Sequence, residues 1–390
     1  MEPTRQRGSE ASLRDEGLDR LKALLGPNWE ITPRTVGTGE PANLSTPRIR
    51  AADVVTISDP TKSHTGPILV EVTEELAPRM ITEQLVPRVE LMRALTGDAA
   101  VLIISPWLSP RSRQVLEELG YGYLDLTGNV SFRINRPGIV VRMQGAQRAP
   151  TPRKSYPRQL KGDKAGALVR AMVDVRPPHR ASELALATGV SLAYVSRLLD
   201  VMEGEALITR RGRSIISVDW RGLLRARSAT YDLLRANPPA SMVAPKGVAD
   251  TLERLACDLD TVQAMGKVAV TGPIASAAVA PLTVGGQLMI HVEDSSPSGL
   301  LHVQRTLGLL PTTTSVGGDV LLLRSASPSI FIGRRMVHGA PHVALSQLAL
   351  DCLGGTGRMP AEGEAVVDYM IRNEAQWQLP TLEAWSDPRR

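Results

Sequence analysis

Apolar residues recur with two different periods along the chain, and these periods predict its secondary structure. In the first part, Ile68–Val72 and Ala100–Ser105 are apolar runs with the length of buried strands. Pro78–Leu95 has helical spacing instead, and Ser109–Pro110 is a typical helix start. Strands that alternate with helices predict an α/β domain with a mixed sheet over residues 1–146.

A turn is predicted near the end of this block. Tyr121–Leu126 and Val130–Ile134 flank the Thr-Gly-Asn sequence at 127–129, which is typical of two strands joined by a tight turn. Asp125 lies between apolar neighbours, where a carboxylate needs hydrogen-bond partners. We expect it to bind Thr127 or backbone amides and to have a structural role.

The middle block, residues 163–235, has the pattern of three helices and a hairpin. Leu168–Val173 has helical spacing, Ala181–Ala187 predicts a short second helix, and Gly189 supplies the sharp turn after it. Ser191 is the predicted N-cap of a third helix. One apolar stripe on that helix comes from three residues spaced i, i+4 and i+7: Val195, Leu199 and Met202.

A basic hairpin is predicted directly after the third helix. Ala206–Thr209 and Ser214–Val218 have strand character and enclose the Arg-Arg-Gly-Arg sequence at 210–213. Three helices followed by such a hairpin predict a winged helix-turn-helix. In that fold the third helix enters a DNA groove, and the hairpin, or wing, lies over the backbone or the minor groove.

The candidate DNA contacts follow from this arrangement, because hydroxyl and guanidinium groups can pair with phosphates or with guanine edges. The candidates on the third helix are Ser191, Leu192, Tyr194, Ser196 and Arg197. The candidates in the wing are Arg210, Arg211 and Arg213. The candidates in the segment before the middle block are Arg153, Lys154 and Arg158.

The charge distribution agrees with a nucleic-acid partner. The chain carries a net charge of +5, and Arg148–Arg227 alone contains 16 Lys and Arg against 7 Asp and Glu, a net of +9. The remainder therefore carries −4. A basic middle between mildly acidic ends fits a polyanion. Residues 147–162 form a Pro-rich basic linker, which we expect to be extended and solvated.

Residues 236–390 predict a C-terminal α+β domain. Val248–Met265 has helical spacing, strand-like segments follow, and Ser346–Leu353 predicts a helix capped by its first serine. The two cysteines, Cys257 and Cys352, fit no metal-binding spacing. We expect both to be buried thiols in a reducing cytosol.

The first block also carries part of a nuclease pattern. Restriction-endonuclease-like domains hold Mg²⁺ between acidic residues on two successive strands, with a lysine two positions after the second acid. Asp53, in the predicted strand Ile49–Ile57, and Glu71 fit the acidic pair, but Thr73 stands at the lysine position. We interpret this block as a restriction-endonuclease-like α/β domain with a degenerate site. Two ordinary strand carboxylates are an equally good explanation.

Several segments together resemble a known family. They are Ser105–Asn129, the winged helix, Val270–Pro281 and His338–Glu374. In this order they resemble the AbiE-type antitoxin family of transcriptional regulators, associated with type IV toxin–antitoxin systems, over Ile49–Trp377. The resemblance implies DNA binding by the winged helix and, in antitoxin members, autorepression of a promoter. The long first block departs from the short antitoxins, which leaves a partner toxin in doubt.

We therefore predict a sequence-specific DNA-binding transcriptional regulator that is not an enzyme and uses no cofactor or metal. The alternatives are a metal-dependent DNA nuclease and an antitoxin that acts through protein contacts. The expected partners are double-stranded DNA and a second copy of the chain, with a toxin or an unknown effector as further candidates. No apolar run approaches the roughly 18 residues that span a bilayer, and the N-terminus has no apolar leader. We expect a cytoplasmic protein.

Overall fold

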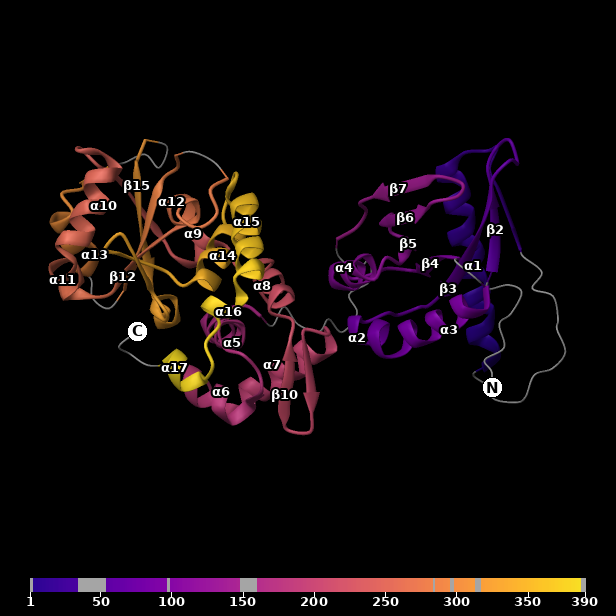
Figure 1. The fold of residues 1–390 in the computed structure, drawn as a ribbon, viewed down its shortest axis with the longest axis horizontal. Helices are drawn as coiled ribbons and strands as arrows, with labels where there is room; N and C mark the ends of the chain where they lie inside the picture. The colour runs from indigo at the N-terminus through magenta and orange to yellow at the C-terminus, as the bar shows by residue number, and fades with distance from the viewer. Residues whose placement is uncertain are drawn as a thin grey trace. The chain divides into compact units, whose positions relative to one another are not determined.

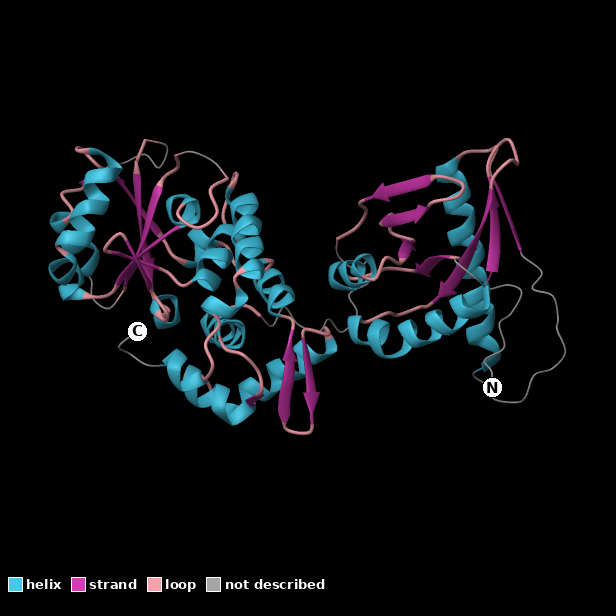
Figure 2. Ribbon diagram, in the orientation of Figure 1, coloured by secondary structure: helices cyan, strands magenta, loops and turns pink. Residues whose placement is uncertain are grey.

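The protein is a mixed α/β molecule whose described part contains three β-sheets (Figures 1 and 2). The structure, a computed structural model, describes residues 3–33, 54–96, 99–147, 160–282, 285–294, 298–312 and 317–386. The chain divides into two compact units. The first comprises 1–155 with 204–206, and the second comprises 156–203 with 207–390.

The first unit is built on a seven-stranded sheet in which the strands follow their order in the sequence. The neighbours β3, β4 and β5 run parallel, and the other neighbours run antiparallel, so the sheet is mixed as expected. The strands are β1 (Glu30–Pro33), β2 (Val54–Ser58), β3 (Thr65–Val72), β4 (Ala100–Ser105), β5 (Gly122–Asp125), β6 (Val130–Ile134) and β7 (Ile139–Met143).

Helices cover both faces of this sheet, because alternate residues of its central strands point to opposite sides. Ile68 and Val70 of β3 pack with Leu21 of helix α1 (Pro3–Leu25) on one face. Leu69 packs on the other face with Val89 of the opposite helical layer. That layer consists of α2 (Pro78–Met80), the π-helical turn η2 (Ile81–Leu85), α3 (Val86–Thr96) and α4 (Pro110–Glu118). The predicted cap of α4 is confirmed, since Ser109 accepts a hydrogen bond from the backbone N–H of Ser112.

The second unit begins with three helices and a small antiparallel sheet of strand order β8-β10-β9. The elements are α5 (Asp163–Asp174), β8 (His179–Arg180), α6 (Ala181–Thr188), α7 (Leu192–Gly204), β9 (Ile208–Arg211) and β10 (Ser214–Val218). The helix-and-hairpin pattern predicted from the sequence is therefore present in this segment.

The rest of the second unit surrounds another seven-stranded sheet, of strand order β14-β11-β15-β13-β12-β17-β16. Its strands are β11 (Pro239–Val243), β12 (Val268–Thr271), β13 (Leu288–Glu293), β14 (Leu310–Pro311), β15 (Val320–Ser325), β16 (Arg335–Val337) and β17 (Ala340–His342). Helices α10 (Gly247–Cys257), α11 (Leu259–Val262) and α13 (Gly299–Thr306) lie on one face (Figure 1). On the other face lie α12 (Gly272–Ala277), α14 (Leu345–Leu353) and α15 (Met359–Arg372). Short helical elements complete the unit: α8 (Trp220–Ser228), α9 (Leu233–Ala236), η3 (Gln263–Met265), η4 (Pro328–Phe331), α16 (Glu374–Trp377) and α17 (Leu382–Ser386).

One hydrophobic core joins the helix-and-hairpin segment to this larger sheet. The core runs without a break from Leu160 to Trp385 and includes residues of α5, α7, β13 and α14. Beside this core the side chain of Arg170 is only 1% exposed. It donates to Asp174 (3.1 and 2.9 Å), to Gln347 of α14 (2.8 Å) and to the carbonyl of Ser329 (3.2 Å). The blocks predicted at 163–235 and 236–390 thus share one interior.

Two local predictions are wrong. Cys352 is buried, but Cys257 is exposed, because it ends α10 on the side of that helix that faces solvent. The helix predicted to be capped by Ser346 begins one residue earlier, with Ala344 at its N-cap, and Ser346 is buried inside the first turn.

In the part of the chain that the structure describes, no single helix has the length and apolar composition needed to cross a membrane. Helices α6 and α7 meet that test only as a pair, across a bend of 120°.

Candidate nucleic-acid interface

Helices α6 and α7 are joined by a short turn that depends on one glycine. Gly189 adopts φ +66°, a left-handed conformation that glycine enters without steric cost. The chain then begins α7, where the carbonyl of Ser191 accepts from the backbone N–H groups of Tyr194 and Val195, both at 3.0 Å. The resulting 120° angle between the two helices is typical of a helix-turn-helix.

One face of α7 is buried in the core, and the other is accessible to solvent. Val195, Leu199 and Met202 are at most 2% exposed, which confirms the predicted apolar stripe. Ser191, Leu192 and Arg197 are exposed, and Ser196 is half-buried. The stripe anchors the helix to the core, and the first two turns of its other face stay accessible.

Tyr194 differs from the other candidates on this helix. Its ring is half-buried and packs against the core. The guanidinium of Arg197 lies over that ring, 5.2 Å from its centroid. Such a cation–π contact restricts the arginine while leaving its N–H groups able to donate. Tyr194 is therefore better placed to support Arg197 than to reach a ligand itself.

The hairpin of β9 and β10 turns tightly at its tip. Arg211 pairs with Ser214, so only Gly212 and Arg213 form the turn, and Gly212 has φ +61°. A two-residue turn with glycine first fits the twist of an antiparallel hairpin. Arg211 and Arg213 are both exposed at this tip.

Arg210, predicted as a third contact of the wing, is half-buried and ion-paired within the protein. Its Nη2 lies 2.7 Å from a carboxylate oxygen of Asp200, and its Nε donates to Glu203 at 3.0 Å. Hydrogen bonding to Glu203 is the main reason that the pKa of Arg210 is raised. The structure therefore separates Arg210 from Arg211 and Arg213: it joins the wing to α7, and its positive charge is compensated.

A groove of about 700 Å³ runs between the start of α6, the start of α7 and the wing. Leu192, Ser196 and Arg213 line it, and so does the ion-paired Arg210. Two further lining residues are Ser182 and Arg180. Both of the latter are exposed and were missed by the sequence analysis. The available signal was their position just before and at the start of the second predicted helix, where an N-terminus also attracts anions.

The remaining DNA candidates and one nuclease candidate cannot be placed. Arg153, Lys154 and Arg158, like Asp53, lie outside the described residues.

The described part of the predicted nuclease site holds an ion pair. Glu71 is 6% exposed, and its carboxylate lies 3.0 Å from the Nε of Arg88. Thr73 donates its hydroxyl to the carbonyl of Glu75 at 2.7 Å. Among the described residues, no group of three or more His, Cys, Asp and Glu side chains is arranged to hold a metal ion.

Asp125 has the structural role expected from its apolar neighbours. Its carboxylate accepts from the backbone N–H groups of Leu108 (3.1 Å), Thr127 (2.9 Å) and Asn129 (3.1 Å). It also accepts from the Thr127 hydroxyl at 2.7 Å, which confirms the predicted local binding. The turn between β5 and β6 is therefore organised around one buried carboxylate.

A second buried carboxylate lies in the second unit beside a serine and a histidine. Ser325 Oγ lies 2.7 Å from His291 Nδ1, and His291 Nε2 lies 2.8 Å from Asp351 Oδ2. Asp351 also accepts from Thr271 (2.6 Å), Gln347 (2.7 Å) and Tyr231 (2.9 Å). The order resembles a nucleophilic triad, but all three side chains are at most 1% exposed. We interpret it as an internal connection between β13, β15 and α14.

Comparison of the chain with family models, with characterised proteins and with solved structures gives no match in any of the three.

Proposed function

We propose that the protein is a sequence-specific DNA-binding transcriptional regulator, and that the segment from α5 to β10 is a winged helix-turn-helix. One observation supports this most strongly. Arg180, Arg197, Arg211 and Arg213 are all exposed around the accessible ends of α6, α7 and the wing, and the described residues that line the groove include no Asp or Glu. A cationic groove beside an accessible helix fits a polyanionic double helix.

The residues would divide the work between position and sequence. Arg211 and Arg213, at a projecting tip, suit phosphates of the backbone. Ser196 and Arg197, on the accessible face of α7, suit the edges of bases, where arginine pairs with guanine. Arg180 adds a phosphate contact at the start of α6.

The experiment compares wild-type protein with the double variant Arg211→Ala/Arg213→Ala on a fluorescein-labelled random-sequence duplex. Each phosphate contact contributes about 0.9 to the slope of log K against log salt concentration. Losing two contacts should flatten the slope by about 2, and fluorescence anisotropy over a salt series measures it.

The matched control is the double variant Arg235→Ala/Lys246→Ala, which removes the same charge from exposed positions outside the groove. It should keep the wild-type slope. Equal slopes for all three proteins, or no binding by wild-type protein at low ionic strength, would contradict the proposal.

We further propose that the protein is a member of the AbiE-type antitoxin-like family, which the segments at 105–129, 270–281 and 338–374 support. We also propose a restriction-endonuclease-like fold for the first unit.

In the cytoplasm, we propose that the protein binds palindromic sites as a homodimer, because each half of a palindrome is bound by one copy of the winged helix-turn-helix. Co-purification with the product of an adjacent nucleotidyltransferase gene would support an antitoxin that acts through protein contacts. A nuclease has weaker support, because Arg88 already neutralises Glu71.

A further inference from the structure

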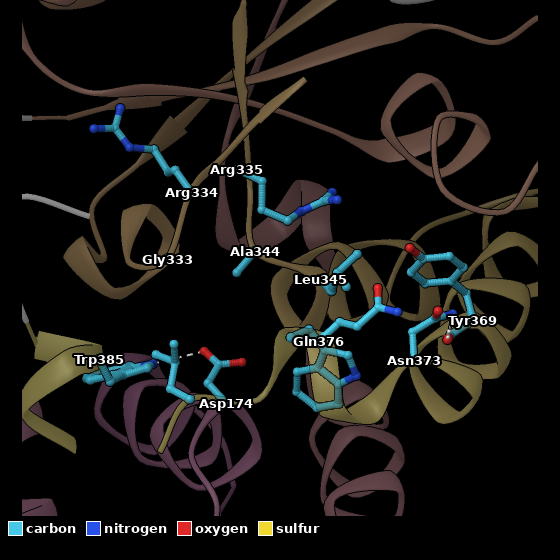
Figure 3. A pocket seen from close by; sticks show the side chains of 12 residues that line it. Asp174, Gly333, Arg334, Arg335, Ala344, Leu345, Tyr369, Asn373, Gln376 and Trp385 are labelled. Atoms are coloured by element: carbon cyan, nitrogen blue, oxygen red, sulfur yellow. Dashed lines mark hydrogen bonds between the residues drawn. The ribbon is translucent and has the colours of Figure 1, made fainter. Parts of the chain in front are cut away.

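A pocket of about 430 Å³ lies inside the second unit, away from the groove just described (Figure 3). It is formed where β16, the start of α14, the end of α15, α16 and α17 meet. We call it the Arg335 pocket. Its defining residues are Arg335, Leu345, Tyr369, Asn373, Trp377 and Trp385. Its volume is within the range of pockets that hold small organic ligands.

One wall of the pocket is cationic. The Nε of Arg335 donates to the carbonyl of Val343 at 3.1 Å, but its Nη2 is buried without a hydrogen-bond partner. Burial lowers the pKa of Arg335, so the surroundings disfavour an uncompensated charge. A buried cation is costly unless an anion pairs with it. Among the described residues, no carboxylate forms an ion pair with Arg335, so this wall is suited to an anion brought by a ligand.

The N-terminus of α14 also favours an anion in the pocket. Ala344 and Leu345, at the N-terminus of this helix, line the pocket. The N-cap is an alanine, so no side chain there accepts from the first N–H groups of the helix. These N–H groups and Arg335 favour negative charge at one place.

Two indole rings form part of the other walls, and their N–H groups are already occupied. Trp377 donates its Nε1–H to the carbonyl of Met370 at 2.8 Å, and Trp385 donates to Asp174 at 2.9 Å. The Asp174 carboxylate is in turn bound by Arg170, which compensates its charge. The indole rings consequently offer apolar surface, which suits a flat apolar body.

We propose that the Arg335 pocket binds a small aromatic carboxylate, whose carboxylate pairs with Arg335 and whose ring packs against Trp377 and Leu345. Arg334 also lines the pocket, but Figure 3 shows that the two arginine side chains take different directions. The Arg335 side chain extends toward Tyr369, whereas the Arg334 side chain points to the opposite side. There Arg334 donates to Gln263 and to the carbonyl of Val268.

The position of the pocket suggests that a bound ligand changes the DNA affinity of the segment from α5 to β10, which we call the reading segment. This extension rests on the proposed function. Asp174, a lining residue, ends α5. Leu379, another lining residue, pairs with the chain between α5 and α6: its N–H donates to Asp174 and its carbonyl accepts from Arg176. A ligand here would touch the segment that leads into the helix-turn-helix.

The test uses the full-length protein and the matched pair phenylacetate and phenylacetamide, which differ in charge and hardly in shape. Isothermal titration should show that phenylacetate binds at least tenfold more tightly than phenylacetamide. Arg335→Gln should abolish that preference. Arg372→Gln, an equal charge change at an exposed residue that does not line the pocket, should keep the preference, and its melting temperature checks that it is folded.

Equal affinity for both compounds, no heat from either, or an unchanged preference in Arg335→Gln would overturn the proposed site. A separate measurement follows DNA affinity with and without saturating phenylacetate. A change of threefold or more supports control of the reading segment. An unchanged affinity overturns that control but leaves the ligand site, which is judged by titration alone.

Discussion

Two neighbouring arginines of the wing show how much a single position matters. Arg210 and Arg211 are adjacent in β9, so their side chains point to opposite faces of the hairpin. Arg210 consequently meets Asp200 and Glu203, and Arg211 meets solvent. Because side chains alternate between the two faces of a strand, the sequence alone could have predicted that Arg210 and Arg211 point in opposite directions. The carboxylate partners could not be identified there, because they depend on the packing of the wing against α7.

Arg210→Ala should loosen the wing, because it leaves the carboxylates of Asp200 and Glu203 without their shared cation. It removes ion pairs that are partly exposed, so the loss in unfolding free energy should be at most about 1 kcal/mol and should shrink at high salt. Denaturant titration at two salt concentrations measures this loss. Arg211→Ala is the comparison and should leave stability unchanged, because no ion pair is lost. Equal losses in both variants would refute the assignment of Arg210 as a joint between wing and helix.

At the scale of elements, the pair α6–α7 was predictable because its signals are local. The apolar stripe of α7 and the glycine after α6 lie within a few residues of the structure that they determine. The starts of helices were harder. Ser109 and Ser346 are both serines next to helical patterns, but only Ser109 is a cap, because the N-cap of α14 is Ala344, two residues before Ser346. Arg180 could not be predicted as a DNA contact, because it lies in the groove only when α6 and the wing have folded together.

Gly189→Ala should destabilise the turn between α6 and α7 by roughly 1–2 kcal/mol, the cost of a left-handed conformation for a residue with a Cβ. No atom lies within 4 Å of the added Cβ, so conformational strain alone sets the size. Gly204→Ala is the matched control: it also meets open space, but its φ is not positive. It should stabilise the end of α7 slightly. Thermal unfolding measures the stability of both variants. An unchanged unfolding free energy in Gly189→Ala would contradict the described turn.

At the scale of the whole molecule, the second unit depends on polar groups that no local pattern reveals. Asp351 receives hydrogen bonds from residues as distant in sequence as Tyr231, Thr271 and His291. The helix-and-hairpin pattern predicts a middle block that is separate from the C-terminal one, but the two share a core in the structure. The shared interior depends on contacts across more than 150 positions, such as that of Arg170 with Gln347, and these leave no periodic trace.

Acid should unfold the second unit through Asp351. Burial alone would raise the pKa of this carboxyl, but His291 and the hydrogen bonds from Thr271 and Gln347 bring it below the ordinary value of 3.8. The charged form is therefore favoured in the folded state. The resulting stability is present above pH 3.8 and is lost as pH falls through the lower folded pKa.

Asp351→Asn should remove this acid-dependent part and cost roughly 3–5 kcal/mol at neutral pH, because its buried donors lose a charged acceptor. Urea titrations at neutral pH and near pH 3 measure both effects. Exposed Asp258→Asn serves as the control and should behave as wild type. A variant whose stability falls on acidification as steeply as that of wild type would refute the role of Asp351.

The long reach of the shared interior also has a consequence for synthesis on the ribosome. Helix α5 is made early, yet Trp385 of α17, which donates to Asp174 at its end, is among the last described residues to emerge. A nascent chain cannot complete this interior while those residues are still in the exit tunnel. About two hundred codons separate Asp174 from Trp385, so during their translation the helix-turn-helix lacks part of the core that supports it.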